Sequence, residues 1–230
     1  EKQEIYSLSF EKGYYERPLL GAKNIPVRGG NRDYTVTVQN TDVLSINIDL
    51  SSPIGMGNLV VKPKQKGETT VTVKDNVTNE TVNLKIKIVD SYLNLKVAHP
   101  AQVPYSGGEN LFFINNSDRD FYLFDEKMEK KECTGNYQFL IKNSTCYMIL
   151  NFDKELNDKS TYEYNISNTS ERMFTLIEIL LGVDWNMKAD LINRSTRSAS
   201  PVIMNAVDTE TNLTQYFVAG SNDIPENILD

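Results

Sequence analysis

Residues 67–89 constrain the fold most strongly, because hydrophobic and polar residues alternate along two runs that a polar turn separates. In the first run Val71 and Val73 alternate with threonine and lysine. In the second run the alternate positions hold Val82, Leu84, Ile86 and Ile88. Successive side chains of a β-strand point to opposite faces of the sheet. The pattern therefore predicts a β-hairpin with one buried face and one face in water.

Further short alternating runs precede this hairpin. They predict strands at residues 4–10, 34–38, 44–50 and 59–62. Residues 11–30 are expected to form a loop, because Pro18, Pro26 and the Gly29-Gly30 pair interrupt any regular pattern. Short strands separated by turn residues at this spacing are typical of an antiparallel β-sandwich.

The same region resembles a bacterial immunoglobulin-like domain of the Big group. The likeness covers about residues 1–90 and rests on D-V-L-S-I at 42–46, on residues 58–75 and on a closing strand that ends at Val89-Asp90. The stretch K-G-E-T-T-V-T-V at 66–73 is its most specific part. The resemblance implies an immunoglobulin-like sandwich that serves as a spacer or adhesion module of an exported protein. It brings no catalytic residues to this chain.

A boundary at Asp90-Ser91 separates this expected domain, residues 1–90, from a second one, residues 91–230. Alternating runs in the second part predict strands at 93–97, 111–114, 121–124, 137–142, 146–152, 162–166, 202–207 and 213–219. The expected class is mainly β, with a second antiparallel β domain that is either a barrel or a sandwich.

A helical excursion is expected near residues 171–194. Asn168-Thr-Ser-Glu171 resembles a capping box, and Gly182 can end a helix that starts after it. Hydrophobic residues fall on one helical face at positions 173, 174, 177, 180 and 181. A fully buried strand is the alternative for this stretch, and a second short helix is expected at 184–194.

Charge and composition argue against several functions. The net charge is −7, and the sequence contains no lysine or arginine patch of the kind that binds nucleic acid. Nucleic-acid binding is therefore not expected. No hydrophobic run reaches the roughly 20 residues of a membrane-spanning helix. His99 is the one histidine, which argues against histidine-based triads and most zinc sites. We expect no cofactor, no metal site and no enzyme activity, hydrolase activity included.

Aromatic residues in expected loops are the candidate ligand-binding groups. They are Tyr105 and Trp185, the latter flanked by Asp184 and Asn186. Sugar rings stack on aromatic faces, while neighbouring acid and amide groups bond to sugar hydroxyls. The alternative is that these aromatic side chains cover the hydrophobic core.

Two cysteines, Cys133 and Cys146, leave two alternatives open: a disulfide or two buried thiols. If Asn143-Ser144 forms a turn, Cys146 lies opposite Ile141 and Cys133 lies beyond the hairpin. The pair would then not be a simple cross-strand pair.

The leading hypothesis is a non-enzymatic, exported bacterial protein of the cell surface or periplasm. Its immunoglobulin-like module would support a β domain that binds a glycan or another surface protein. We expect a signal peptide or a lipid anchor to be encoded upstream of Glu1. One alternative is a calycin-like carrier whose inward aromatic residues line an apolar cavity: Tyr137, Phe139, Phe152, Tyr162 and Tyr164. Another is a structural spacer or assembly subunit.

Overall fold

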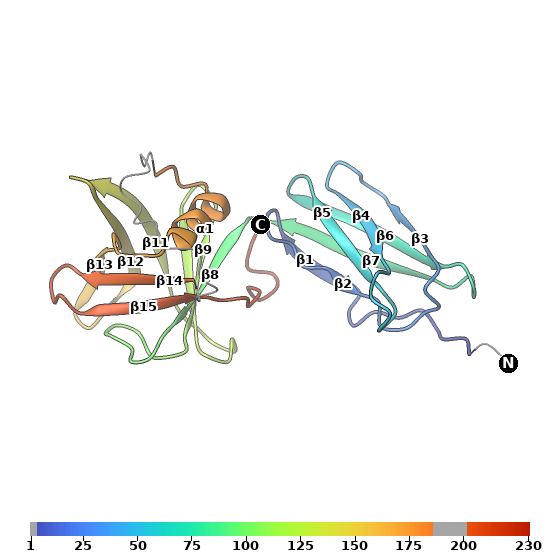
Figure 1. Ribbon diagram of the computed structural model, residues 1–230, viewed down its shortest axis with the longest axis horizontal. Helices are drawn as coiled ribbons and strands as arrows, with labels where there is room; N and C mark the ends of the chain where they lie inside the picture. Colours follow the sequence, from blue (N-terminus) through green and yellow to red (C-terminus); the bar gives the residue numbers. More distant parts are fainter. Residues whose placement is uncertain (1–3, 186–201) are drawn as a thin grey trace. The chain divides into compact units, whose positions relative to one another are not determined.

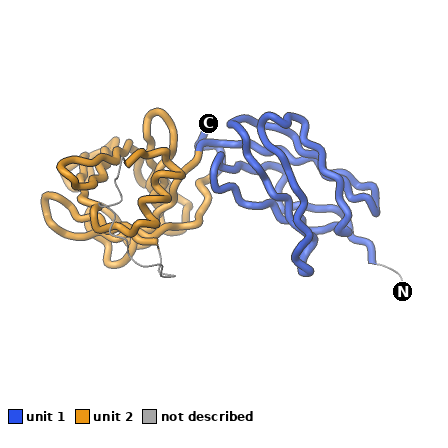
Figure 2. Tube along the Cα trace, turned by 45° about the horizontal axis from the view of Figure 1, so that its top comes forward, with its two compact units in different colours: residues 1–90, 226–230 blue, residues 91–225 orange. Residues whose placement is uncertain are grey.

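The computed structural model describes residues 4–185 and 202–230, and the chain divides into two compact units (Figures 1 and 2). Unit 1 comprises residues 1–90 and 226–230, and unit 2 comprises residues 91–225. Strands dominate both units, and the described residues contain one α-helix. The predicted mainly β class is therefore confirmed.

Unit 1 contains two sheets, as in a sandwich. The four-stranded sheet has the order β1-β7-β6-β3, and the three-stranded sheet has the order β2-β5-β4. The strands are β1 (Tyr14–Pro18), β2 (Ile25–Pro26), β3 (Tyr34–Val38), β4 (Leu44–Asp49), β5 (Asn58–Pro63), β6 (Gly67–Asp75) and β7 (Thr81–Val89). Hydrophobic side chains from both sheets form one core cluster.

The predicted hairpin is confirmed as β6 and β7. Val71 lies opposite Leu84 and Val73 lies opposite Val82 in the antiparallel register. Val71, Leu84 and Ile86 are completely buried, whereas Lys85 is exposed. The alternation thus separates the core face from the solvent face as expected.

The N-terminal part of unit 1 differs from its prediction. Residues 4–10 form no strand and make one isolated bridge, between Ser9 and Gly29. The expected loop at 11–30 instead contains β1 and β2, and β1 pairs with β7 in parallel. Tyr15, beside Ile86, buries its ring there, and this burial explains why the segment joins the sheet.

The last five residues belong to unit 1, although the expected second domain extended to residue 230. Glu226 forms an ion pair with Lys12, and the backbone N–H of Asn227 donates to Oε1 of Glu16 at 2.9 Å. Leu229 is 5% exposed, and its carbonyl accepts from a lysine of β7. In the structure, unit 2 therefore ends at Pro225.

Unit 2 is a closed eight-stranded barrel, which decides between the two expected architectures. The strands follow one another around the barrel, every neighbouring pair is antiparallel, and β15 closes onto β8. They are β8 (Tyr92–Val97), β9 (Asn110–Ile114), β10 (Asp120–Phe124), β11 (Lys131–Lys142), β12 (Thr145–Leu156), β13 (Lys159–Asn165), β14 (Ile203–Asp208) and β15 (Thr214–Ala219).

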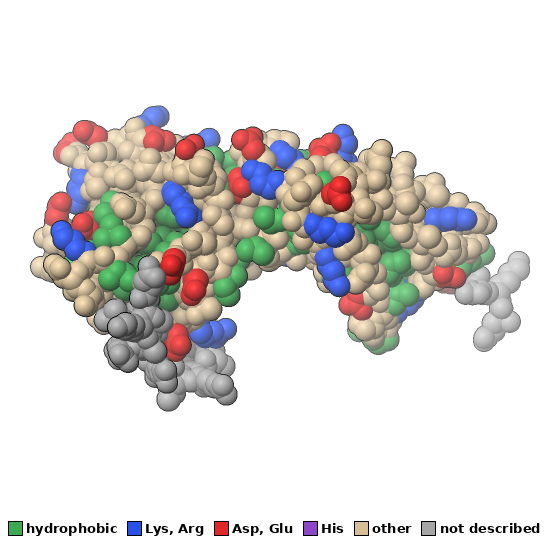
Figure 3. Space-filling model, turned by 90° about the horizontal axis from the view of Figure 1, so that it is seen from above, with side chains coloured by type: hydrophobic (Ala, Val, Ile, Leu, Met, Phe, Trp, Pro, Cys, Tyr) green, Lys and Arg blue, Asp and Glu red, His purple; other side chains and the backbone are tan. Residues whose placement is uncertain are grey.

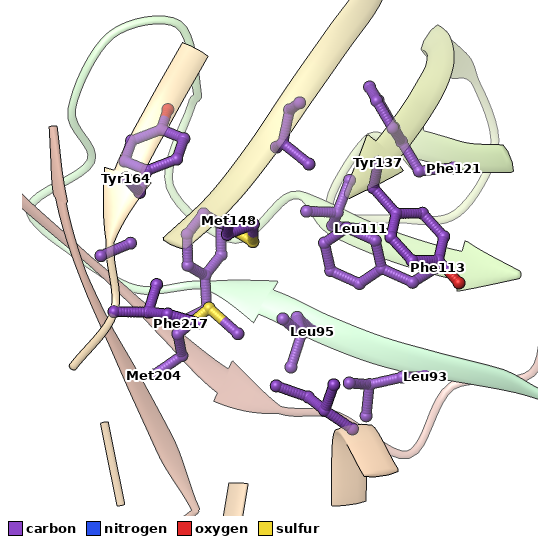
Figure 4. Close-up of a cluster of buried hydrophobic side chains, with 14 of the residues drawn as sticks. Leu93, Leu95, Leu111, Phe113, Phe121, Tyr137, Met148, Tyr164, Met204 and Phe217 are labelled. Carbon is purple, nitrogen blue, oxygen red and sulfur yellow. The ribbon is translucent and has the colours of Figure 1, made fainter. Parts of the chain in front are cut away.

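The barrel interior is filled by side chains that converge from several strands. Figure 4 shows residues such as Leu95, Phe113, Met148 and Phe217 pointing toward one another. All four are completely buried. Large hydrophobic side chains therefore hold the barrel together from inside.

Helix α1 (Glu171–Leu181) covers the end of the barrel that carries the β9–β10 and β11–β12 turns. Its N-cap is Ser170, whose side chain accepts from the N–H of Met173, rather than the expected Asn168. Gly182 ends the helix in a left-handed conformation, as predicted. The Arg119 guanidinium in the β9–β10 turn donates to the Leu181 carbonyl and so stabilises the negative end of the helix dipole.

Candidate functional site

Tyr105, a predicted ligand-binding residue, lies inside the barrel. It is 6% exposed, and its hydroxyl accepts a hydrogen bond from the Tyr164 hydroxyl at 3.2 Å. Its ring meets Phe217 edge-on with centroids 5.3 Å apart. Tyr105 thus anchors the loop between β8 and β9 in the core and does not offer a ring face to a ligand.

Trp185 is also a core residue. It is 4% exposed, its indole N–H donates to the Phe174 carbonyl at 3.1 Å, and its ring packs edge-on against Phe139 and Phe174. Asp184 is exposed, and Asn186 lies outside the described residues. Trp185 packs at the α1 end of the barrel and Tyr105 near the other end, so the structure does not bring these predicted residues into one site.

The two cysteines are free thiols, and the disulfide alternative is wrong. Cys146 pairs with Ile141 of β11, as expected from the Asn143-Ser144 turn. Cys133 lies eight residues before Ile141 on the same strand, which corresponds to roughly 26 Å at about 3.3 Å per residue. A disulfide needs Cα atoms within about 7 Å of each other.

A pocket of about 220 Å³ opens at the end of the barrel opposite α1, and we call it the seam pocket. It lies between β13, the β14–β15 turn and the β8–β9 loop. Its lining residues are Gln102, Val103, Asn157, Lys159, Tyr162, Tyr164, Asp208, Glu210, Thr211, Leu213 and Gln215. Of the five inward aromatic residues singled out from the sequence, Tyr162 and Tyr164 line this pocket.

The pocket exists because the barrel wall is incompletely paired at this position. Strands β13 and β14 share two register pairs, Tyr164 with Asp208 and Asn165 with Val207. Strand β14 ends at Asp208, so the first part of β13 has no β14 partner. One backbone hydrogen bond, from the N–H of Thr209 to the Glu163 carbonyl at 3.1 Å, continues the contact beyond the strand. Side chains rather than backbone therefore line this gap.

Asp208 is the most deeply placed acid of the pocket and is 6% exposed. Its Oδ1 accepts from the backbone N–H groups of Glu210 and Thr211 at 2.8 and 3.1 Å. These bonds fix the carboxylate at the start of the β14–β15 turn. Oδ2 takes part in no hydrogen bond with the described residues. One oxygen of a buried carboxylate is therefore left for a group that enters the pocket.

Gln215 holds the loop that forms the opposite wall. It is 1% exposed, its Oε1 accepts from the backbone N–H of Gln102 at 2.7 Å, and its Nε2 donates to the Tyr216 carbonyl at 2.7 Å. A buried amide with both ends bonded fixes the position of its partners. The wall beside Gln102 is consequently preformed.

Lys159 lies at the edge of the pocket between an acid and an aromatic ring. Its ammonium is 2.8 Å from a carboxylate oxygen of Glu210 and 4.5 Å from the centre of the Tyr162 ring. The ion pair links β13 to the β14–β15 turn across the gap in the wall. A lysine over an aromatic face is a favourable cation–π arrangement.

The pocket raises the pKa of both of its tyrosines above the ordinary phenol value. Burial is the main cause for Tyr164, and the negative charge of Asp208 adds to it. Burial is also the main cause for Tyr162, where Lys159 acts in the opposite direction. Both phenols therefore stay neutral hydrogen-bonding groups near neutral pH.

Residues 4–185 and 202–230 offer neither a metal site nor a membrane-spanning helix. No group of three or more His, Cys, Asp or Glu side chains in these ranges could hold a metal ion. No helix in the same ranges is long and apolar enough to cross a membrane. On the face shown in Figure 3, basic and acidic side chains are interspersed.

The seam pocket was not foreseen from the sequence. The sequence predicts Tyr162 and Tyr164 as inward residues, whereas Asp208 directly follows the strand expected at 202–207 and is not among the candidate site residues. The available signal was an acid at the end of an alternating hydrophobic strand, Met204–Ala206–Asp208, where it continues the inward face.

Comparisons with known proteins give little further guidance. No family model matches the chain, and no curated protein matches it. Among solved structures, domains 5–6 of the S-layer protein SbsC are 12% identical with a TM-score of 0.32, covering 70% of this chain and 90% of that one. Domains 4–9 of surface layer protein SbsC are 10% identical with a TM-score of 0.32, covering 94% of this chain and 31% of that one. Likeness at this level identifies neither a family nor a function.

Proposed function

We propose that the protein is a non-enzymatic, exported bacterial protein of the cell surface or periplasm. Unit 1 acts as a support module, and the barrel of unit 2 binds a glycan or another surface protein. The observation that carries the binding role is the seam pocket, where a gap in the barrel wall exposes one oxygen of a buried carboxylate. Concave sites with a few convergent polar groups are the usual form of a small-ligand site.

The resemblance of residues 1–90 to Big-group domains supports export and a spacer role for unit 1. It is an argument from analogy, because a fold by itself does not define a function. The hairpin at 67–89, which carries the most specific part of the likeness, forms in the structure.

The surroundings of the two acids in the pocket support a binding role over glycosidase chemistry. A glycosidase needs one carboxyl group that is protonated near neutral pH and can donate a proton. Asp208 accepts two backbone N–H bonds, and Glu210 is paired with Lys159. Both acids therefore act as hydrogen-bond or ion-pair acceptors within the fold, and neither side chain is placed as a proton donor.

The carrier alternative receives less support from this geometry. An apolar carrier needs a cavity of several hundred Å³. The seam pocket measures about 220 Å³, and its hydrophobic lining residues other than the two tyrosines are Val103 and Leu213. Phe152, one of the inward aromatic residues, packs against Phe121 and Tyr162 at ring-centre distances of 5.0 and 5.6 Å.

Two assays test the proposal together. In the first, a protease is added to intact cells and to cells whose outer layer has been made permeable while the inner membrane stays intact, and we expect it to degrade the protein in the second sample at least. In the second, purified protein is applied to immobilised glycans and to surface-protein extracts, and the variant Val103→Trp is compared with the wild type. Val103 is 62% exposed and lines the pocket, so a tryptophan there should obstruct the entrance.

The matched control is Val77→Trp, an exposed valine in the β6–β7 turn of unit 1. We expect Val103→Trp to weaken binding and Val77→Trp to leave it unchanged. A protein found only in the cytoplasm would refute the surface role. Binding that survives Val103→Trp unchanged would refute the role of the pocket, and an absence of any binding partner would favour the spacer alternative.

A further inference from the structure

The charged side chains of the seam pocket indicate which ligand charge it favours. Three charged side chains line it: Asp208, Glu210 and Lys159. Two acids and one base leave one negative charge in excess. Anionic ligands are therefore disfavoured, and a ligand with one positive charge would balance the site.

The excess charge is located at Asp208. Lys159 is engaged by Glu210 at 2.8 Å, and Asp208 belongs to no ion pair among the described residues. Asp208 is nevertheless 6% exposed, and its Oδ2 accepts no hydrogen bond from those residues. Oδ2 is not among the fully buried side-chain atoms that lack a partner, so it faces the open pocket and can accept from a cation or a donor that enters.

The pocket already contains an ammonium group in a suitable setting. The Lys159 ammonium is held between a carboxylate and the face of Tyr162, with its side chain 25% exposed. A carboxylate and an aromatic face thus both contact a primary ammonium at the edge of the pocket. A second ammonium placed against Oδ2 of Asp208 would meet the same combination of a carboxylate and nearby tyrosines.

Neutral hydrogen-bonding groups surround this position. The side chains of Gln102, Asn157 and Thr211 line the same pocket, together with the two tyrosines. Amide and hydroxyl groups are the usual partners of sugar hydroxyls. The volume of about 220 Å³ is below the roughly 300–1,000 Å³ of sites for drug-sized ligands, which suits one ring rather than an extended molecule.

Building on the proposed ligand-binding role, we infer that the seam pocket selects a sugar ring that carries a free ammonium group, which Asp208 binds. This specifies the glycan class as an amino sugar whose nitrogen is not acetylated. Val103 and Leu213 lie at the pocket edge, and Asp208 lies deeper, so the charged group enters first.

The test is a binding titration followed by NMR at about pH 6, where a sugar amine is protonated. The probes are glucosamine, glucose and N-acetylglucosamine. We expect glucosamine to bind at least about tenfold more tightly than the other two, since a hydrogen bond between charged partners has roughly that effect. Equal binding of all three sugars, reduced by Val103→Trp, would overturn the charge inference and leave the proposed function standing.

The decisive variant is Asp208→Asn, which retains an Oδ1 acceptor for the N–H groups of Glu210 and Thr211. The control is Asp118→Asn, an equal charge change at an exposed position in the β9–β10 turn at the other end of the barrel. We expect Asp208→Asn to abolish the preference for glucosamine and Asp118→Asn to retain it. A preference that survives Asp208→Asn, or no binding of glucosamine to the wild type, would overturn the inference.

Two measurements on the wild type make the test independent of how the variant folds. Raising the pH to about 9.5 deprotonates the sugar amine while lysine stays mostly charged, so the preference for glucosamine should disappear. A preference that persists there would contradict the inference. Tighter binding of Nα-acetyl-lysine amide than of glucosamine would also contradict it, because the pocket would then select a lysine side chain of a protein.

Discussion

Replacing Ile86 with alanine should destabilise unit 1 specifically. Ile86 is completely buried on β7, between Thr69 of β6 and Tyr15 of β1. Truncating a buried isoleucine to alanine costs about 2–5 kcal/mol, through lost hydrophobic transfer energy and the remaining cavity. A central expectation is about 3 kcal/mol, a large part of the roughly 5–15 kcal/mol that stabilises a typical domain.

The adjacent residue provides the control. The Lys85 side chain is 56% exposed and lies 3.3 Å from Glu68, whose side chain is 45% exposed. Exposed ion pairs of this kind contribute about 0–1 kcal/mol. Lys85→Ala should therefore lower the free energy of unfolding by less than about 1 kcal/mol.

Urea unfolding measures both variants with two signals. Trp185, the single tryptophan, is buried in unit 2 and reports on the barrel by fluorescence, whereas circular dichroism reports on the strands of both units. We expect Ile86→Ala to shift part of the circular dichroism transition to lower urea and to leave the fluorescence transition in place. Equal shifts of both signals would refute the view that each unit has its own core. Similar losses from Ile86→Ala and Lys85→Ala would refute the assigned faces of β7.

Four further predictions follow from the structure and the sequence. Trp185→Ala should lower the stability of the barrel by about 3–5 kcal/mol in urea unfolding without weakening ligand binding of the folded protein. Weaker ligand binding by a folded variant would show that Trp185 contributes to the binding site. Arg119→Ala should cost about 1.5–3 kcal/mol on the fluorescence transition, because the Leu181 carbonyl loses a charged donor; an unchanged midpoint would contradict this. Mass spectrometry after alkylation of denatured, unreduced protein should find Cys133 and Cys146 both modified, and a disulfide between them would refute the free thiols. In the folded protein burial raises the pKa of both thiols, so their alkylation should accelerate only at a pH above the usual thiol range. The codons upstream of Glu1 should encode a signal peptide or a lipidation site, and an initiator methionine directly before Glu1 would contradict export.

Strict alternation explains which elements could be predicted from the sequence. The β6–β7 hairpin and most barrel strands have one buried face each, so a period of two marks them clearly. Strand β1 lacks this signal, because it contains Tyr14-Tyr15, ends at Pro18 and pairs in parallel with a strand about 70 residues later. Its position depends on the long-range burial of Tyr15 against Ile86, which local patterns do not contain.

The candidate site was harder to predict than the fold, for a related reason. The sequence offers two interpretations of Trp185, a ligand-binding residue in a polar loop or a residue that covers the core, and the structure shows its ring packed against Phe139 and Phe174. Asp208 directly follows the strand expected at 202–207, and it is a turn residue in the structure, since its Oδ1 accepts two turn N–H groups. The position of its other oxygen in the seam pocket depends on β14 ending at the gap beside β13. This is a property of the closed barrel rather than of any single segment.

Mapping the ligand contact residue by residue tests the central claim most directly. Amide signals of the protein would be followed by NMR during a titration with glucosamine. The account predicts shifts concentrated at residues 157–164 and 208–215, with smaller changes near Gln102, and loss of these shifts in Val103→Trp. Shifts concentrated around α1 and Trp185, or no shifts in the seam pocket at saturating sugar, would contradict it.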